Sequence, residues 1–150
     1  MNKIHISQIG VGYWGPNLLR NLVSNSNINL TTVVDLSEER RHFVESHYPS
    51  VQTTDNVDDI LNNPDIEAVV ISTPVETHYN LAIKALNAGK HILVEKPMAT
   101  TSDEVNAIHT LATEKNLVAM VGHTFLFNNT VRTIKKLIDD GELGEIRYIY

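Results

Sequence analysis

Three glycines near the start of the chain have the spacing of a dinucleotide site. The motif Gly10-Val11-Gly12-Tyr13-Trp14-Gly15 matches G-x-G-x-x-G, and it lies between a strand-length apolar run and an amphipathic helical pattern. The glycines permit a tight turn, close approach of a pyrophosphate to the backbone, and close packing of helix against strand. The helix N-terminus offers free N–H groups to phosphates. We therefore expect residues 10–15, here named the phosphate loop, to bind a cofactor. The residues concerned are Gly10, Gly12, Tyr13, Trp14 and Gly15.

An acidic residue follows the phosphate loop at the distance that a dinucleotide site needs. Asp35 ends the second apolar run, 20 residues after Gly15. A carboxylate there accepts hydrogen bonds from the ribose hydroxyls of the adenosine and repels a 2′-phosphate. No arginine follows immediately, because the next residues are Leu36, Ser37 and Glu38. The pattern predicts NAD as the cofactor, in preference to NADP.

Three other interpretations stay open from these residues alone. The glycines could form a turn without a ligand, and Asp35 could be an ordinary turn residue. A methyltransferase that uses S-adenosylmethionine also has a glycine-rich first loop and an acid after its second strand. Against the methyltransferase, Gly15 fits the dinucleotide motif better, and the chain lacks the reversed hairpin that ends such sheets.

Two later strand ends carry polar side chains. Ser72-Thr73-Pro74 follows one apolar run, with His78 in the first turns of the next helix, and His123 follows the last run. Because the carboxyl ends of parallel strands meet at one edge of a sheet, we expect these residues to border the cofactor crevice. The remaining histidines show no metal-ligand spacing, so no metal site is expected. They are His5, His42, His47, His91 and His109.

Glu95-Lys96-Pro97 follows another apolar run, and here the sequence places a lysine at a strand end. Pro97 restricts Lys96 to an extended backbone, which sets the direction of the side chain. A partly desolvated ammonium there could hydrogen-bond a substrate hydroxyl and relay its proton during hydride transfer. The alternative is a surface lysine paired with Glu95.

Strands and helices that alternate along the chain must position these residues. The apolar runs are nearly continuous, as in strands covered on both faces of a parallel sheet. They lie at 4–9, 30–34, 68–71, 92–94 and 117–121, with a weaker one at 51–53. Amphipathic helical patterns separate them. This alternation predicts an α/β fold, a doubly wound parallel sheet of strand order 3-2-1-4-5-6.

Polar side chains mark where four of the helices should begin. Ser37 is expected to cap the second helix, and Asp55 is expected to cap a short third one. Thr73–Glu76 and Thr101–Glu104 both have the spacing of a capping box.

The composition excludes several classes of protein. The chain has 150 residues, of which 42% are hydrophobic and 20% are charged, so one folded domain is expected. The lack of cysteine excludes disulfides, thiolate metal sites and cysteine nucleophiles, and favours a cytoplasmic location. The net charge of −6 argues against nucleic-acid binding. No apolar run approaches the roughly 18 residues of a membrane span, and no signal peptide is recognised.

Several stretches of the chain resemble one oxidoreductase family. They are GVGYWGPNLLRN, VVD, VVISTPVETHYNLAIKALNAGKHILVEKPMA, VGHTFLFN and IKKLIDDGELGEIRYIY. On these motifs the chain is similar to the Gfo/Idh/MocA family of NAD(P)-dependent dehydrogenases and reductases, which act mostly on sugars, inositols and nucleotide sugars. VGHTFLFN resembles the nucleotide-sugar 3-dehydrogenase branch. The resemblance implies an N-terminal Rossmann domain followed by a C-terminal α/β domain with a largely antiparallel sheet.

The resemblance also implies a role for each site residue. The three glycines of the phosphate loop would hold the pyrophosphate, and Asp35 would hold the adenosine ribose. Glu95 and Lys96 would lie near the nicotinamide, with Lys96 contacting the substrate and assisting proton transfer. The peptide bond before Pro97 would be cis. His123 would face the nicotinamide or the substrate.

The chain departs from the family in its length, since family members are usually much longer. We expect 1–122 to be the Rossmann dinucleotide-binding domain, and 123–150 to hold the start of a truncated C-terminal domain. That start would comprise a helix from about Asn129 to Gly141 and a strand at Glu145–Tyr150. The second domain would be essentially absent, so the chain alone would have little or no turnover.

The resemblance implies partners for the whole protein. It would act on a small sugar or nucleotide-sugar substrate, form a homo-oligomer, and bind neither nucleic acid nor a membrane. The alternative is a non-catalytic NAD-binding module that serves as a sensor or regulatory subunit.

Overall fold

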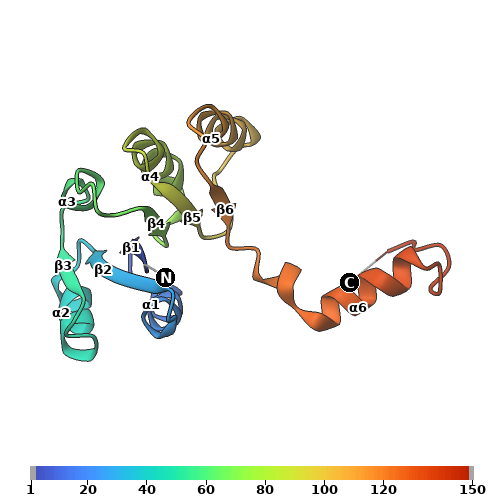
Figure 1. Ribbon diagram of the computed structural model, residues 1–150. Helices are drawn as coiled ribbons and strands as arrows, with labels where there is room; N and C mark the ends of the chain where they lie inside the picture. The colour runs from blue at the N-terminus through green and yellow to red at the C-terminus, as the bar shows by residue number, and fades with distance from the viewer. Residues whose placement is uncertain (1–2, 149–150) are drawn as a thin grey trace.

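The computed structural model describes residues 3–148, and a parallel sheet forms its centre (Figure 1). Six strands lie in the order β3-β2-β1-β4-β5-β6, and every neighbouring pair is parallel. This topology confirms the doubly wound Rossmann fold that the sequence predicts. The strands are β1 (Ile4–Ile9), β2 (Ile28–Val34), β3 (Gln52–Thr54), β4 (Ala68–Ile71), β5 (His91–Val94) and β6 (Ala119–Val121).

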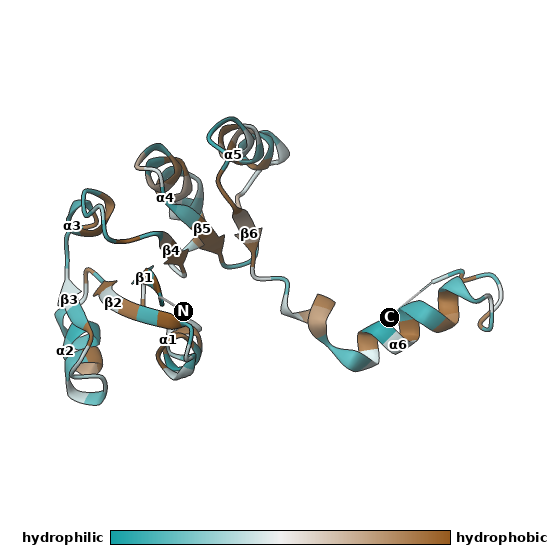
Figure 2. Cartoon of the chain, viewed as in Figure 1, coloured by the Kyte–Doolittle hydropathy of each residue, from teal (hydrophilic) through white to brown (hydrophobic). Residues whose placement is uncertain are grey.

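Helices cover the sheet on both faces. They are α1 (Gly15–Ser24), α2 (Glu38–His47), α3 (Asp58–Leu61), α4 (Val75–Asn87), α5 (Ser102–Glu114) and α6 (Asn129–Asp139), with a 3₁₀ turn η1 (Thr124–Phe127). Successive strand residues point to opposite faces. Val33 and Val70 accordingly pack in an apolar cluster with α1 and α2, whereas Val34 and Val69 pack in a second cluster with α3, α4 and α5. Figure 2 shows the apolar residues along β4, β5 and β6 that this double coverage requires.

Two of the four predicted helix caps are formed. The Ser37 hydroxyl accepts a hydrogen bond from the Arg40 N–H at the start of α2. At α5, Thr101 and Glu104 form a complete capping box. These caps supply acceptors for N–H groups that have no partner within the helix.

The other two predicted caps are wrong. Helix α4 begins at Val75, so its N-cap position is Pro74, which has no polar side chain to offer. The Thr73 hydroxyl instead pairs with the Thr77 hydroxyl at 2.7 Å. Helix α3 begins three residues after Asp55, and the Asn56 side chain accepts the Asp58 N–H there.

The chain beyond β6 extends away from the sheet (Figure 1). Its helix α6 begins at Asn129 as predicted and is followed by Gly141, which has a positive φ of 75°. Apolar side chains along this segment are exposed, among them Phe125 and Ile134. The strand expected at Glu145–Tyr150 is not formed over residues 145–148, and residues 149–150 lie outside the described part. A strand needs a neighbour for its backbone groups, and the strand pairs formed within residues 3–148 are all among β1–β6.

A buried lysine joins two loops at the amino-terminal edge of the sheet. The Lys90 ammonium donates hydrogen bonds to the carbonyl oxygens of Asn63, at 2.6 Å, and Ile66, at 2.8 Å. Burial lowers the pKa of Lys90, and the nearby carboxylate of Asp65 opposes this shift only in part. A neutral amine keeps two N–H donors, so both carbonyl groups remain satisfied after the proton is lost.

We expect alkaline pH to stabilise the wild-type chain relative to a Lys90→Met variant. Because folding lowers the pKa of Lys90, the folded chain binds fewer protons than the unfolded chain below 10.5, the ordinary value for lysine. The free energy of unfolding therefore rises with pH in this window. At neutral pH the substitution should lower that free energy by about 1–3 kcal/mol, because two carbonyl groups lose their donors.

Urea unfolding at several pH values measures both effects. Lys115→Met, which removes an exposed lysine just after α5, is the matched control and should change neither quantity. A difference between wild type and Lys90→Met that does not vary with pH contradicts this account of Lys90.

Candidate functional site

The carboxyl ends of the six strands surround one open cavity of about 1450 Å³. It is lined by residues that follow each of the strands β1–β6. Its volume exceeds the roughly 300–1,000 Å³ of a pocket for a drug-sized ligand, so an extended ligand can be accommodated. All the predicted site residues line this cavity except Gly15 and His123.

The space around each glycine of the phosphate loop shows whether the protein's own packing excludes a Cβ there. Gly10 has a φ of 88°, and a Cβ there would lie 2.7 Å from the Ser72 carbonyl oxygen. A Cβ on Gly15 would lie 2.8 Å from the Gly10 carbonyl oxygen, so Gly15 allows α1 to begin directly against the loop. At Gly12 the nearest atom to a Cβ would be a guanidinium nitrogen of Arg40, at 3.5 Å. The protein's own packing does not require Gly12, whereas a ligand approaching the backbone would.

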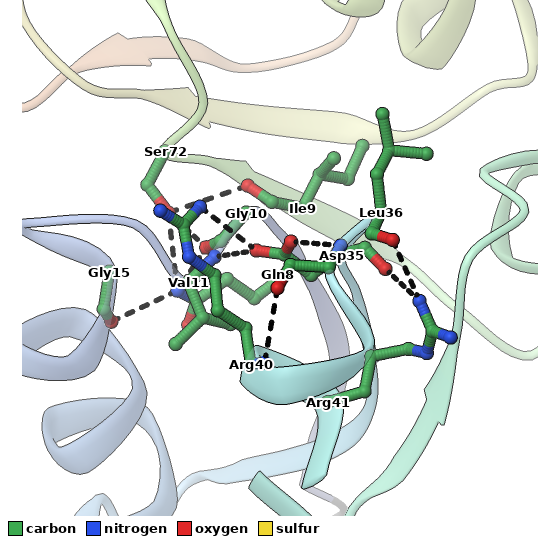
Figure 3. Close-up of polar contacts among 11 residues, drawn as sticks. Gln8, Ile9, Gly10, Val11, Gly15, Asp35, Leu36, Arg40, Arg41 and Ser72 are labelled. Atoms are coloured by element: carbon green, nitrogen blue, oxygen red, sulfur yellow. Dashed lines mark hydrogen bonds and ion pairs between the residues drawn. The ribbon is translucent and has the colours of Figure 1, made fainter. Parts of the chain in front are cut away.

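A buried glutamine inside β1 braces the phosphate loop from behind (Figure 3). The Gln8 side-chain amide donates hydrogen bonds to the carbonyl oxygens of Gly10, at 2.9 Å, and Gly15, at 3.0 Å. The Ser72 hydroxyl donates a second bond to the Gly10 carbonyl at 2.7 Å. Gln8 and Ser72 thus hold both ends of the loop and link it to β4. The Gln8 Oε1 atom is buried and has no hydrogen-bond partner among residues 3–148.

Asp35 is almost buried, and its carboxylate binds the backbone of the loops that follow β1 and β2 (Figure 3). One oxygen accepts the Val11 N–H at 2.7 Å, and the other accepts the Ser37 N–H at 2.9 Å. The Arg40 guanidinium lies 3.8 Å from the first of these oxygens. A carboxylate has about four acceptor positions. Asp35 therefore keeps acceptor capacity for ribose hydroxyls while it fixes the loop.

Glu95 and Lys96, which follow β5, do not pair with each other through their charged groups. Glu95 is 9% exposed, and its carboxylate accepts the Lys96 backbone N–H at 3.1 Å. A Cβ on Gly122, after β6, would lie 3.1 Å from a Glu95 oxygen, so Gly122 leaves space for this acid. The Lys96 ammonium makes no ion pair within residues 3–148, which disfavours the interpretation as a lysine paired with Glu95. The Lys96–Pro97 peptide is cis, as the resemblance implies.

The two predicted site residues outside the cavity have different positions. Gly15 lies behind the phosphate loop, where its contribution is close packing of helix against strand. His123 follows β6 and has an exposed side chain, while its neighbours Gly122 and Thr124 line the cavity. Tyr13 is also highly exposed at the cavity rim.

Sequence reasoning missed two residues of the site. Gln8 had a signal that could have been noticed, since it is a polar side chain in an apolar run two residues before Gly10. Arg40 had a weaker one. It lies three residues after Ser37, one turn into α2, and only the helix brings its guanidinium back over the cavity.

Neither a metal cluster nor a membrane span is found in the described part of the chain. Over residues 3–148, no three histidine, aspartate or glutamate side chains gather as a metal ion would require. No helix in the same range is both long and apolar enough to cross a bilayer.

Comparison with known proteins identifies relatives of the chain. Residues 4–123 match the sequence model of the Gfo/Idh/MocA oxidoreductase family, described as an NAD-binding Rossmann fold. The chain is 31% identical over 147 residues to the 1-carboxy-3-chloro-3,4-dihydroxycyclo hexa-1,5-diene dehydrogenase of Comamonas testosteroni. It is 36% identical over 107 residues to the NADP(+)-dependent scyllo-inositol 2-dehydrogenase of Bacillus subtilis.

Solved structures agree with these sequence matches. The scyllo-inositol dehydrogenase of Lactobacillus casei with bound NAD(H) and scyllo-inositol superimposes with a TM-score of 0.87 at 25% identity. The alignment covers 97% of this chain and 43% of that one. The alignment with the Comamonas dehydrogenase likewise covers 98% of this chain and 37% of that protein. The alignment with the Bacillus enzyme covers 71% of this chain and 30% of that protein. It spans less than half the length of these relatives.

The cavity fits a dinucleotide on the evidence of its own residues. The backbone at Gly12 is open to the cavity, and α1 begins without a side-chain cap, so its first N–H groups remain available to phosphate oxygens. Asp35 supplies acceptors for hydroxyl groups at the end of the neighbouring strand.

We expect Gln8→Leu to weaken binding of NAD by about three- to tenfold, because the carbonyl groups of Gly10 and Gly15 lose the donor that orders the loop. The free energy of unfolding should also fall by about 1–3 kcal/mol. Calorimetric titration with NAD and urea unfolding measure the two effects.

Ser7→Ala is the matched control for Gln8→Leu. Ser7 is also buried in β1, but its hydroxyl pairs with the Thr31 hydroxyl, away from the phosphate loop. This variant should lose stability without losing affinity for NAD. Equal affinities for NAD in wild type and Gln8→Leu would show that Gln8 does not order the loop.

Proposed function

We propose that this chain, which belongs to the Gfo/Idh/MocA oxidoreductase family, is the NAD-binding part of a dehydrogenase that oxidises or reduces a hydroxyl-bearing carbon. The observation that carries this proposal is the position of Lys96. Its side chain lines the cavity at the end of β5, without an ion-pair partner in residues 3–148, beside a phosphate loop that fits a dinucleotide.

Residues at different positions along the cavity would bind the cofactor and move the substrate proton. The phosphate loop and the start of α1 bind the pyrophosphate, and Asp35 binds the adenosine ribose. When bound, the nicotinamide supplies a hydride donor or acceptor. The Lys96 ammonium lies at the end of β5, where it can hydrogen-bond the substrate oxygen and hold or release the hydroxyl proton as the carbon changes oxidation state. Glu95 orients this segment through the Lys96 N–H.

We propose a sugar, inositol or nucleotide sugar as the substrate. The names of two relatives support a cyclic polyol, since both are scyllo-inositol dehydrogenases. A polyhydroxylated ring also suits the chemistry, because one hydroxyl must be held by a proton relay such as Lys96 while the others offer hydrogen bonds for orientation.

The chain would need further residues for turnover. We propose that residues 1–122 form the dinucleotide-binding domain and that 123–150 begin a second domain, as the match of the family over 4–123 supports. The exposed apolar side chains after β6 support the same division. On this view residues 1–150 bind NAD but turn over little alone, and the whole protein is a homo-oligomer.

The choice between NAD and NADP rests on two side chains. Asp35 repels a 2′-phosphate, which favours NAD. The half-exposed Arg40 guanidinium lies beside it and could instead attract that phosphate. The Asp35 carboxylate is nearly buried and accepts two backbone N–H groups, so we propose that its charge dominates and that NAD is preferred.

We expect Asp35→Asn to raise the ratio of NADP affinity to NAD affinity by about tenfold or more. The substitution removes the charge that repels a 2′-phosphate and frees Arg40 to pair with it. Adding Arg40→Met to Asp35→Asn should cancel most of the gain. Calorimetric titrations with both cofactors measure the ratio.

Arg20→Met, which removes an exposed arginine on α1, is the control and should leave the ratio unchanged. Tighter binding of NADP than NAD by the wild-type protein would overturn the assignment of Asp35.

We expect Lys96→Met, made in the whole protein, to lower turnover by about 10²- to 10⁴-fold, the usual contribution of a positioned proton donor. The dissociation constant for NAD should change by less than about threefold, because the proton relay acts on the substrate. Steady-state kinetics with a panel of inositols and sugars, together with NAD titration, separate these quantities.

Lys115→Met is again the control, since that side chain is exposed and remote from the cavity. Unchanged turnover in Lys96→Met would remove Lys96 from the mechanism. A whole protein that binds NAD but shows no turnover on any polyol would favour the sensor function instead.

A further inference from the structure

His78 lies on α4 with both ring nitrogens against the backbone. Nδ1 is 2.8 Å from the carbonyl oxygen of Pro97, and Nε2 is 2.8 Å from the carbonyl oxygen of Thr73. The side chain is 2% exposed, although it borders the cavity. These contacts occupy the whole hydrogen-bonding capacity of the ring, so His78 has no atom left for a cofactor.

The two partners determine where the ring hydrogens must be. A backbone carbonyl oxygen can only accept, so each ring nitrogen must donate if both contacts are hydrogen bonds. A neutral imidazole donates through one nitrogen only and would direct a lone pair at the other carbonyl. The ring that satisfies both contacts is the imidazolium, which donates twice.

The two carbonyl groups belong to segments that flank the reacting end of the cavity. Thr73 follows β4, and Pro97 follows Lys96 across a cis peptide bond after β5. Strands β4 and β5 are hydrogen-bonded neighbours that end at Ile71 and Val94. One residue further, the Glu95 N–H still donates to the Ile71 carbonyl at 2.9 Å. His78 bridges the two segments beyond that bond, one residue from the backbone that carries the Lys96 side chain.

We propose that His78 is a positioning residue, a doubly protonated clamp that joins the ends of β4 and β5 and so orients Lys96 toward the substrate. The proposal rests on the proposed function of Lys96. It moves His78 from the cofactor-binding role expected from the sequence to a role exerted through the Pro97 carbonyl. His78 acts on the rate of the reaction and contributes little to cofactor affinity.

The protonation of the ring can be tested without measuring activity. In the whole protein labelled with ¹⁵N at histidine, long-range ¹H–¹⁵N spectra at neutral pH should show both His78 ring nitrogens in the protonated form. The signal is assigned by its loss in His78→Gln. One protonated and one unprotonated nitrogen would overturn the two-sided clamp, whatever the outcome of the experiments on Lys96.

The consequence for Lys96 is tested by kinetics of the same variant. A glutamine side chain donates from one amide nitrogen only and cannot bridge both carbonyl groups. His78→Gln should lower kcat by about tenfold or more, since small displacements of a reacting group cost up to about 10²-fold. The dissociation constant for NAD should change by less than about threefold. His109→Gln, an exposed histidine on α5, should leave both quantities unchanged.

Three outcomes would overturn the role of His78 as a clamp for Lys96. The first is a loss of NAD affinity in His78→Gln that matches or exceeds the loss of kcat, which would indicate a cofactor contact. The second is an unchanged kcat. The third is equal loss of kcat in His78→Phe and His78→Gln accompanied by an equal fall in Tm, which would indicate a role in folding alone. Activity retained in Lys96→Met would overturn the proposed function but leave the ¹⁵N result to decide whether the clamp exists.

Discussion

The turn at Gly10 is the constraint on which the rest of the site depends. Its N–H donates to the Val34 carbonyl of β2 at 2.7 Å, and its carbonyl accepts bonds from Gln8 of β1 and Ser72 after β4. Three adjacent strands are therefore joined at one residue, at the point where the strand order of the sheet reverses. Only a residue without a Cβ fits against the Ser72 carbonyl there, at a φ of 88°. The cavity opens beside this turn because the crossovers diverge from it.

Buried polar side chains then fix the loops that the sheet no longer holds. Gln8 holds the phosphate loop, Asp35 holds the backbone of Val11 and Ser37, and His78 bridges the segments after β4 and β5. Each acts on backbone groups that would otherwise lie in the cavity wall without partners, which is costly in a buried position. The arrangement prepares the cavity before a ligand arrives, so less binding energy is needed to order it.

The sequence was most informative where local chemistry and topology coincide. Continuous apolar runs located the strands, and their alternation with helices predicted the strand order and the place of the cavity, because crossovers between parallel strands follow a general rule of handedness. The predicted caps at Asp55 and Thr73 were wrong, because each helix begins later than the first polar side chain that precedes it. At α4 the N-cap position is occupied by Pro74. Arg40 has only a weak local signal, and the contact of His78 with the Pro97 carbonyl joins residues 19 apart in the chain, so no local pattern reveals it.

The two ends of the cavity differ in how completely this chain supplies them. At the end formed by the phosphate loop and Asp35, the backbone groups are braced by buried side chains of the sheet itself. At the end formed by Lys96 and Gly122, the wall continues into η1, whose Phe125 is 74% exposed although it lines the cavity. An exposed aromatic side chain at a cavity wall excludes water only when something covers it. The described residues therefore brace the end of the cavity that would hold the cofactor, whereas the proposed reaction at the other end would need a surface packed over η1 to exclude water.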